Sequence, residues 1–316
     1  MHLLIPFAAS SSPVGQQALE HLSLPNLEKL LARLVLSNTD EADASSLTPA
    51  HERARARALG LSAPDGHVPW AARQAMQTGL AQQVSASAAW AWITPCHWNV
   101  HADYIMMDNP QALTLQVSES QVLLDAMRPY FEEDGITLHY AAPTQWLACG
   151  EVFRELATAS LDRVVGCDID AWLPKAAHAA ALRRLQSEMQ MLLYTHPATD
   201  ERAARGLVPV NSFWVSGAGA LPTSWSEPAL EEPVLPDTLR EAALAGDWAT
   251  WSRCWRELDG TACAALLRAL QAGHSVRLTL CGERSALTFE RGHPGVFKKI
   301  MSQFGRQPLS SLRDKL

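Results

Sequence analysis

The chain has 316 residues, a net charge of −7 and a pI near 5.9, and 47% of its residues are hydrophobic. This length allows two domains or one core with a large insertion, and the composition excludes wholesale disorder. The acidic balance argues against nucleic-acid partners, which favour clustered basic surface. The six cysteines form no CxxC pair, and no run approaches the roughly 20 apolar residues of a spanning helix. We therefore expect reduced thiols, a cytoplasmic protein and no membrane partner.

The N-terminal third predicts a strand and two helices. An apolar run over residues 3–7 leads into a loop of small residues at 8–13. Leucines at helical spacing predict a helix from residue 24 to 34. Thr48 and Pro49 predict the N-cap and first position of a second helix.

The pattern in the middle of the chain predicts a small α+β module. Strands are predicted over 89–98, 112–117, 136–140 and 144–148, with a helix over 118–131 between the second and the third. A long helix is predicted from Pro174 to Tyr194. This order of elements is typical of a sheet with helices on one face.

The last third returns to alternating strands and helices. A strand over 208–216 is predicted to run into a Gly217-Ala218-Gly219 turn, and an acidic, proline-rich connection follows at 223–236. Helices are predicted over 237–245, 248–257 and 263–272, and a strand over 275–280. Trp248, Trp251 and Trp255 share one helical face and predict core packing. The alternation indicates a mostly parallel α/β sheet.

Three stretches resemble one enzyme family. One is Thr195-His196-Pro197 followed by Arg202, Gly206, Pro209, Asn211 and the Gly217–Gly219 segment; the others are residues 24–30 and 115–127. The chain resembles the archaeal-type cofactor-independent phosphoglycerate mutases of the alkaline phosphatase superfamily, and is most similar to a bacterial branch labelled regulatory protein of RpfE type. The resemblance implies a three-layer, alkaline-phosphatase-like α/β core over 1–88 and 206–316. It also implies an inserted α+β domain with a long helix over 89–205.

Several metal-binding residues of the resembled family have no counterpart in this chain. The family uses two metal ions, which carboxylates and histidines must hold, to activate a serine nucleophile. Its first strand ends in Asp-Gly, where this chain has Pro6-Phe7, and its later His-Asp-Gly turn corresponds to residues 244–246, Leu-Ala-Gly. Its final Asp-His pair corresponds to Glu283-Arg284, and arginine cannot bind a metal because it stays protonated. We expect no metal and no cofactor.

Two groups of residues remain as site candidates. Counting back from Gly60 places His51 and Glu52 at the nucleophile position, and a histidine can accept a phosphoryl group. The alternative is that both lie on a solvated helix beside three arginines. The ligand-binding candidates are Asn211, Gly217, Gly219 and Arg202, because a Gly-x-Gly turn offers amides to an anion and arginine clamps phosphate. The alternatives there are an asparagine that holds the strand and arginines in surface ion pairs.

Three functions follow from these observations. The first is a catalytically degenerate regulatory or binding protein on a mutase scaffold. The second is an active phosphoglycerate mutase, or another phosphotransfer enzyme, with a rebuilt site. The third is a module that binds a phosphorylated metabolite. The sequence identifies no partner, and a phosphorylated metabolite or another protein are the two kinds that fit.

Overall fold

The computed structural model describes residues 1–85, 87–175, 179–227, 232–292 and 309–316. These residues form two compact units. Unit 1 contains Met1–Ser45, Pro49–Gly60 and the described residues from Glu227 to Leu316, and unit 2 contains Ser46–Thr48 and Leu61–Ser226. Unit 2 is therefore inserted in the sequence of unit 1.

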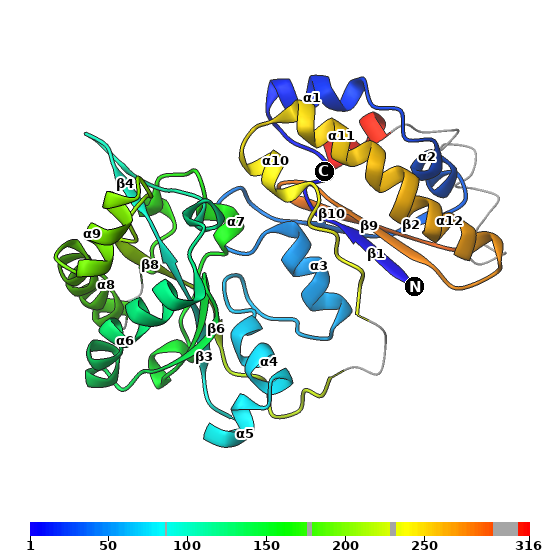
Figure 1. The fold of residues 1–316 in the computed structure, drawn as a ribbon. Helices are drawn as coiled ribbons and strands as arrows, with labels where there is room; N and C mark the ends of the chain where they lie inside the picture. The colour runs from blue at the N-terminus through cyan, green and yellow to red at the C-terminus, as the bar shows by residue number, and fades with distance from the viewer. Residues whose placement is uncertain (86, 176–178, 228–231, 293–308) are drawn as a thin grey trace. The chain divides into compact units, whose positions relative to one another are not determined.

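Unit 1 is an α/β unit built around one sheet (Figure 1). Its elements are β1 (His2–Ile5), α1 (Pro13–Glu20), α2 (Pro25–Leu31), β2 (Val35–Glu41), α3 (Ala50–Ala58), α10 (Arg240–Leu244), α11 (Trp248–Leu258), the π-helix η5 (Asp259–Cys263), α12 (Ala264–Gln271), β9 (Arg277–Cys281), β10 (Ser285–Glu290) and the 3-10 helix η6 (Leu309–Lys315).

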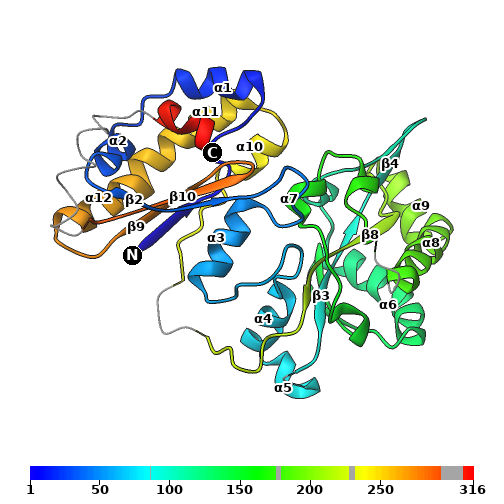
Figure 2. The ribbon, with the colours of Figure 1, turned by 180° about the vertical axis from the view of Figure 1, so that it is seen from behind.

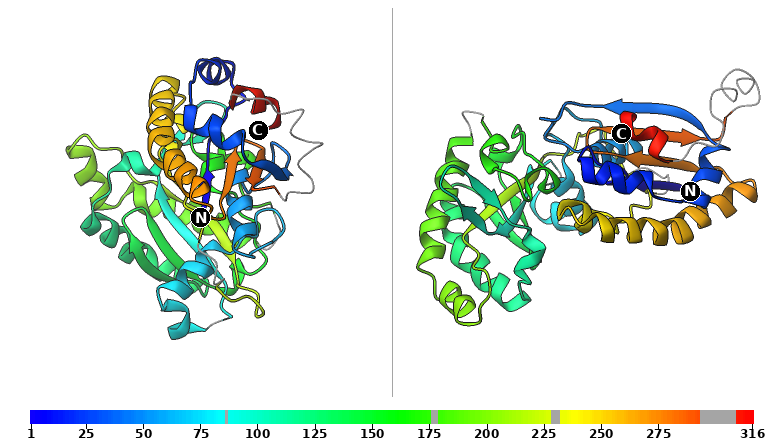
Figure 3. Two further views of the ribbon diagram at one scale, coloured as in Figure 1. Left: turned by 90° about the vertical axis from the view of Figure 1, so that its right-hand side faces the viewer. Right: turned by 90° about the horizontal axis from the view of Figure 1, so that it is seen from above.

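The strands of this sheet follow the order β1-β9-β10-β2, with strands from the two ends of the sequence side by side (Figure 3). β1 and β9 run parallel, whereas β10 runs antiparallel to both β9 and β2. The expectation of a mostly parallel sheet is wrong. Only residues 282–284 join β9 to β10, and a parallel partner needs a crossover of a dozen or more residues.

The sheet of unit 1 lies between two helical layers. Leu3, Ile5 and Leu278 belong to the apolar core shared with α1, α2, α11 and α12, and Trp251 and Trp255 are fully buried there as predicted. On the other face, Leu4 packs against Ala50 and Ala54 of α3. Successive strand residues point to opposite faces, so β1 contributes to both cores.

The N-terminus of α2 is fixed by a buried carboxylate from the π-helix. Asp259 is 4% exposed and accepts hydrogen bonds from the backbone amides of Asn26 (3.2 Å) and Leu27 (2.8 Å) and from the Asn26 side chain (3.2 Å). The first amides of a helix have no partner inside it, and α2 has no side-chain cap of its own. Asp259 therefore supplies the cap from a distant part of the chain.

Unit 2 contains the remaining helices and strands (Figure 2). They are α4 (Trp70–Gln77), α5 (Leu80–Val84), β3 (Trp90–Cys96), β4 (Trp98–Val100), β5 (Ile105–Met107), η1 (Pro110–Leu113), α6 (Val117–Glu133), β6 (Thr137–Ala142), β7 (Gln145–Cys149), η2 (Glu151–Phe153), α7 (Leu161–Val164), η3 (Ile169–Ala171), α8 (Ala180–Tyr194), α9 (Pro197–Ala204) and β8 (Ser212–Gly219).

The main sheet of unit 2 is antiparallel, with the order β6-β7-β3-β8, and β4 and β5 form a separate pair. Helices α6 and α8 pack on one face of this sheet, and α4 packs on the other. The predicted strand over 112–117 is wrong. Asn109 caps a 3-10 turn that Pro110 begins, and α6 starts at Val117.

The predicted α/β class is confirmed, and the three layers of unit 1 agree with the layered core expected for it. The compact units divide the chain at positions different from 89 and 205. Residues 61–88 and 206–226 lie in unit 2, since α4 packs on β3 and β8 pairs with β3. None of the helices in the described part of the chain combines the length and apolar character needed to cross a bilayer.

Replacing Asp259 tests the distant cap. Asp259→Ala leaves the amides of Asn26 and Leu27 without their acceptor, so we expect the free energy of unfolding to fall by about 2–3 kcal/mol. Asp259→Asn keeps one acceptor oxygen and should cost less. Urea denaturation followed by circular dichroism measures this, with two transitions fitted if the units unfold separately.

The matched control is Asp43→Ala, which removes an exposed carboxylate of the same unit and should change the stability by no more than about 0.5 kcal/mol. Equal stabilities for the Asp259→Ala and Asp43→Ala proteins would contradict the cap.

Candidate functional site

The carboxyl edge of the unit 1 sheet gathers the positions that the resemblance singles out. Because β1 and β9 are parallel neighbours, the loops that follow them leave the sheet at the same edge. The Ala8 amide donates to the Cys281 carbonyl (2.7 Å) and joins the two loops. The Phe7 ring lies 5.3 Å from the ring of His51, near the start of α3.

His51 and Glu52 lie in the first turn of α3. His51 is 7% exposed and packs on Phe7, whereas Glu52 is half-buried. The expected solvated helix is therefore wrong for His51, because the ring of Phe7 covers it. Pro49 takes the N-cap position and α3 starts at Ala50, one residue later than predicted. A nucleophile must reach its substrate, and the burial of His51 works against that role.

Phe7 itself has an unusual backbone. Its φ is 54°, in the left-handed region that glycine adopts freely and other residues rarely do. The resemblance places a glycine here, in the Asp-Gly that ends the family's first strand. The chain thus has a glycine-like turn with a large side chain. The Phe7 carbonyl accepts a hydrogen bond from the Trp251 indole (2.9 Å), which helps to fix this conformation.

Glu283 is held by the loop that follows β1. One carboxylate oxygen accepts hydrogen bonds from the Ser10 hydroxyl (2.9 Å) and the Ser11 amide (2.9 Å), and the other accepts from the Ser11 hydroxyl. Ser12 then caps α1 by accepting from the Gly15 amide (3.1 Å). The loop of small residues thus binds an anionic group that the chain itself provides. We call Ser10, Ser11 and Glu283 the serine clamp.

The next residue is tied down through its backbone. Arg53 donates to the Arg284 carbonyl (2.6 Å) and to the carboxylate of Asp40 (3.3 Å), which also accepts from Arg57 (3.3 Å). These contacts connect α3, β2 and the β9–β10 turn, and fix the position from which the Arg284 side chain extends.

A polar cavity of about 410 Å³ opens beside the serine clamp. Ser10, Ser11 and Glu283 contribute to its wall. It is also lined by the basic residues Arg284, Arg313 and Lys315 and by the acidic residue Glu41. Arg313 is paired with Glu20. This volume suits a small metabolite, and the lining of hydroxyl, basic and acidic groups suits a polar one.

The part of the chain that the structure describes offers this cavity no metal-ligand set. Within the described residues, three or more His, Cys, Asp or Glu side chains nowhere gather as a metal site. Gly246 has a φ of 66°, so the turn at residues 244–246 is present with aliphatic side chains where the family has ligands. Burial raises the pKa of the Cys281 thiol well above its usual range, which keeps the thiol protonated.

The four residues predicted to bind a ligand, Arg202, Asn211, Gly217 and Gly219, belong to unit 2. Gly217 and Gly219 are part of β8. The predicted turn is wrong, because β8 continues to pair with β3 across a bulge between Trp90 and Trp92. Gly217 has a φ of 60°, and a Cβ there would lie 2.9 Å from the Trp92 ring. The Ala218 amide between the two glycines donates to the Thr158 hydroxyl (3.3 Å).

Asn211 holds β4. Its side-chain oxygen accepts from the Trp98 amide (2.7 Å), and its side-chain nitrogen donates to the Trp98 carbonyl (3.0 Å). The amide thus pairs with Trp98 as a neighbouring strand would. Two roles are expected for Asn211 from the sequence, ligand binding or holding a strand. This geometry favours the second.

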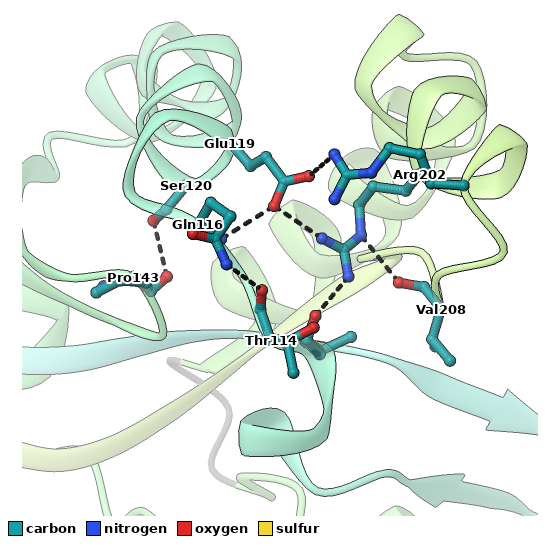
Figure 4. A network of polar contacts seen from close by, with 9 residues as sticks. Thr114, Gln116, Glu119, Ser120, Pro143, Arg202 and Val208 are labelled. Atoms are coloured by element: carbon teal, nitrogen blue, oxygen red, sulfur yellow. Dashed lines mark hydrogen bonds and ion pairs between the residues drawn. The ribbon is translucent and has the colours of Figure 1, made fainter.

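Arg202 lies at the centre of a buried network (Figure 4). It is 2% exposed and donates to the carbonyls of Val208 (2.9 Å) and Leu113 (2.6 Å) and to the carboxylate of Glu119 (3.0 Å). The exposed Arg205 donates to the other oxygen of Glu119 (2.7 Å). Each nitrogen of the Arg202 guanidinium thus has a protein acceptor, which favours a structural role over phosphate binding.

Glu119 is the acid of this network and also the third residue of α6, where it accepts from the Gln116 amide (2.9 Å). Burial acts to raise the pKa of Glu119, but the hydrogen bonds from Gln116 and Arg205 and the charges of the two arginines outweigh burial. The net result is a lowered pKa.

Sequence reasoning missed the serine clamp. The sequence predicts Glu283 only as part of a replaced metal-binding pair, and Ser10 and Ser11 only as loop residues. One pattern does point to this loop: three serines precede a proline directly after a strand, which is typical of a helix start. Nothing local in the sequence connects that run with a glutamate more than 270 residues away.

Comparisons with known proteins give a weak likeness. No family model matches the chain, and no curated protein matches it. Among solved structures, the cofactor-independent phosphoglycerate mutase from Thermoplasma acidophilum DSM 1728 has a TM-score of 0.38 at 13% identity, covering 99% of this chain and 97% of that one. The PH0037 protein from Pyrococcus horikoshii has a TM-score of 0.44 at 12% identity, covering 92% and 86%. Likenesses this distant do not establish an activity or a ligand.

Replacing Arg202 tests its structural role. Arg202→Ala leaves two buried carbonyls without a donor and removes the buried arginine from Glu119, so we expect the free energy of unfolding to fall by about 3–5 kcal/mol. Arg205→Ala is the matched control, since it removes an exposed partner of the same carboxylate and should cost no more than about 1 kcal/mol. Urea denaturation measures both. A cost for Arg202→Ala no larger than for Arg205→Ala would contradict the role.

The lowered pKa of Glu119 predicts a pH dependence of stability. A carboxyl group with a lowered pKa stabilises the folded state above its unfolded-state pKa, and this stabilisation is lost as the pH falls through the folded-state value. The stability advantage of the natural protein over Glu119→Gln should therefore be constant near neutral pH and shrink in the acid range below about 4.5. Denaturation midpoints of both proteins across this range measure it, and a constant difference down to the acid limit would count against it.

Proposed function

We propose that this protein binds a ligand without catalysing its conversion, on a scaffold of the alkaline phosphatase kind that has lost its metals. The observation that carries the proposal is the serine clamp. At the edge where the resemblance puts the metal site, the acidic side chain of the β9–β10 turn is held by serines. Three hydrogen bonds from serines already occupy most of the lone-pair positions of this carboxylate, which leaves it less capacity to bind a metal.

The position of His51 supports the same proposal. A phosphotransfer enzyme needs an accessible nucleophile close to the groups that stabilise the transferred charge. His51 is covered by Phe7, and no metal set is found among the described residues. His51 and Glu52 thus remain candidates only for the alternative function, a phosphotransfer enzyme with a rebuilt site.

The cavity beside the clamp supports an anionic metabolite as the ligand. Arg284 extends into it from a backbone that Arg53 holds, and hydroxyl groups line the same wall. Arginine suits phosphate because its planar fork donates two parallel hydrogen bonds. A cytoplasmic location and a regulatory role of the RpfE type are expectations that come with the resemblance.

Two measurements separate binding from catalysis. We expect elemental analysis of the purified protein to show no stoichiometric manganese or zinc, and 3-phosphoglycerate with added manganese to show no turnover. Two metal ions per chain would contradict the proposal, as would turnover that disappears in His51→Ala.

A thermal-shift screen of phosphorylated metabolites tests the ligand class. A ligand at 100 times its Kd stabilises the folded protein by about 2.7 kcal/mol. The stabilisation should be lost in Arg284→Ala and kept in Arg33→Ala, which removes an exposed arginine of the same unit. A flat screen would exclude the metabolites tested and leave another protein as the ligand.

A further inference from the structure

The face of the unit 1 sheet that meets α3 is divided in two. Near the carboxyl edge, Leu4, Cys281 and Ala286 pack with Ala50 and Ala54 of α3. Toward the other end of the strands the same face is polar. Thr279, Thr288 and Asn38 are directly paired across three strands, and His2 lies beside them on β1. The apolar contacts of α3 do not extend over this half, so its polar side chains can meet water or a polar ligand.

These polar side chains form a chain of hydrogen bonds. The His2 ring nitrogen Nε2 lies 2.9 Å from the Thr279 hydroxyl, which lies 3.0 Å from the Thr288 hydroxyl. Each threonine hydroxyl has one donor and two acceptor positions, so this chain leaves hydrogen-bonding capacity unused. The Asn38 side chain makes no hydrogen bond to any described residue, although its amide has two donors and an acceptor.

The polar half is concave. A groove of about 320 Å³ lies over it, bounded by the last turn of α3 and by the side chains of the four strands. We call it the sheet-face groove. It shares no lining residue with the cavity beside the serine clamp. Its volume is at the lower end of the range found for sites that bind small molecules.

The arginines of the groove contact carboxylates. Arg277 is paired with Glu290, and Arg57 shares the carboxylate of Asp40 with Arg53, so this one carboxylate faces two arginine charges. Burial, followed by the charges of Arg277 and the terminal amino group, lowers the pKa of His2 to about 4. At neutral pH the imidazole is therefore uncharged, with one donor and one acceptor nitrogen.

We propose that the sheet-face groove binds a neutral molecule rich in hydroxyl groups, a monosaccharide or a cyclic polyol. Such a ligand both donates and accepts hydrogen bonds, which matches the hydroxyls of Thr279 and Thr288 and the amide of Asn38. A phosphorylated or carboxylate ligand would have to compete with Asp40 and Glu290 for these arginines, whereas a neutral ligand would not. The proposal does not depend on the function proposed for the other cavity.

The test is a titration of the full-length protein, with its threonine methyl groups isotopically labelled for NMR. D-glucose, D-ribose and myo-inositol are the probes. We expect at least one of them to shift the Thr279 and Thr288 signals saturably. Thr288→Val keeps the shape and removes one hydroxyl, so it should weaken binding about three- to tenfold, and Asn38→Ala should do the same.

Thr39→Val is the matched control. Thr39 is the next residue along β2 and lines the other cavity, so binding in the sheet-face groove should be unchanged. Three results would overturn the proposal: no saturable shift with any of the three probes, equal affinities in Thr288→Val and Thr39→Val, or binding of glucose 6-phosphate without binding of glucose.

Discussion

The arrangement of unit 1 depends on the parallel pairing of β1 with β9. Because both strands end at one edge, the loop of small residues after β1 meets the turn after β9, and Glu283 reaches the serines at 10 and 11. The short return to β10 fixes that turn from the other side, and Arg53 holds its backbone. A single strand pairing thus brings the carboxylate of Glu283 to the serines at one edge of the sheet.

The two faces of this sheet differ in how much of their surface is apolar and covered by helices. One face is closed by four helices and two fully buried tryptophans, and is apolar throughout its core. On the other face α3 approaches closely through alanines, but its apolar contacts involve only one half of the strands. The uncovered half is polar and hydrogen-bonded within itself, as expected for a surface that meets water or a polar ligand.

Sequence patterns predicted elements well where periodicity was strong, and poorly where one residue changed the outcome. Core packing was predicted for the tryptophan face of α11; Trp251 and Trp255 are buried, and Trp248 is partly buried against the same core. The prediction of a turn at Gly217–Gly219 was wrong. Glycines with positive φ also occur in β-bulges, and here β8 continues to pair with β3 across such a bulge. The strand β10 was not predicted at all, and with it the antiparallel return through the three-residue connection that follows β9.

The sequence by itself determined the fold class and the positions of most elements. Only the tertiary structure decided what the remaining residues do. Arg202 and Asn211 hold unit 2 together, His51 lies beneath Phe7, and Glu283 is bound by serines. The reason is that these contacts join residues far apart in the chain, and the roles of polar side chains follow from their partners, which local patterns do not specify.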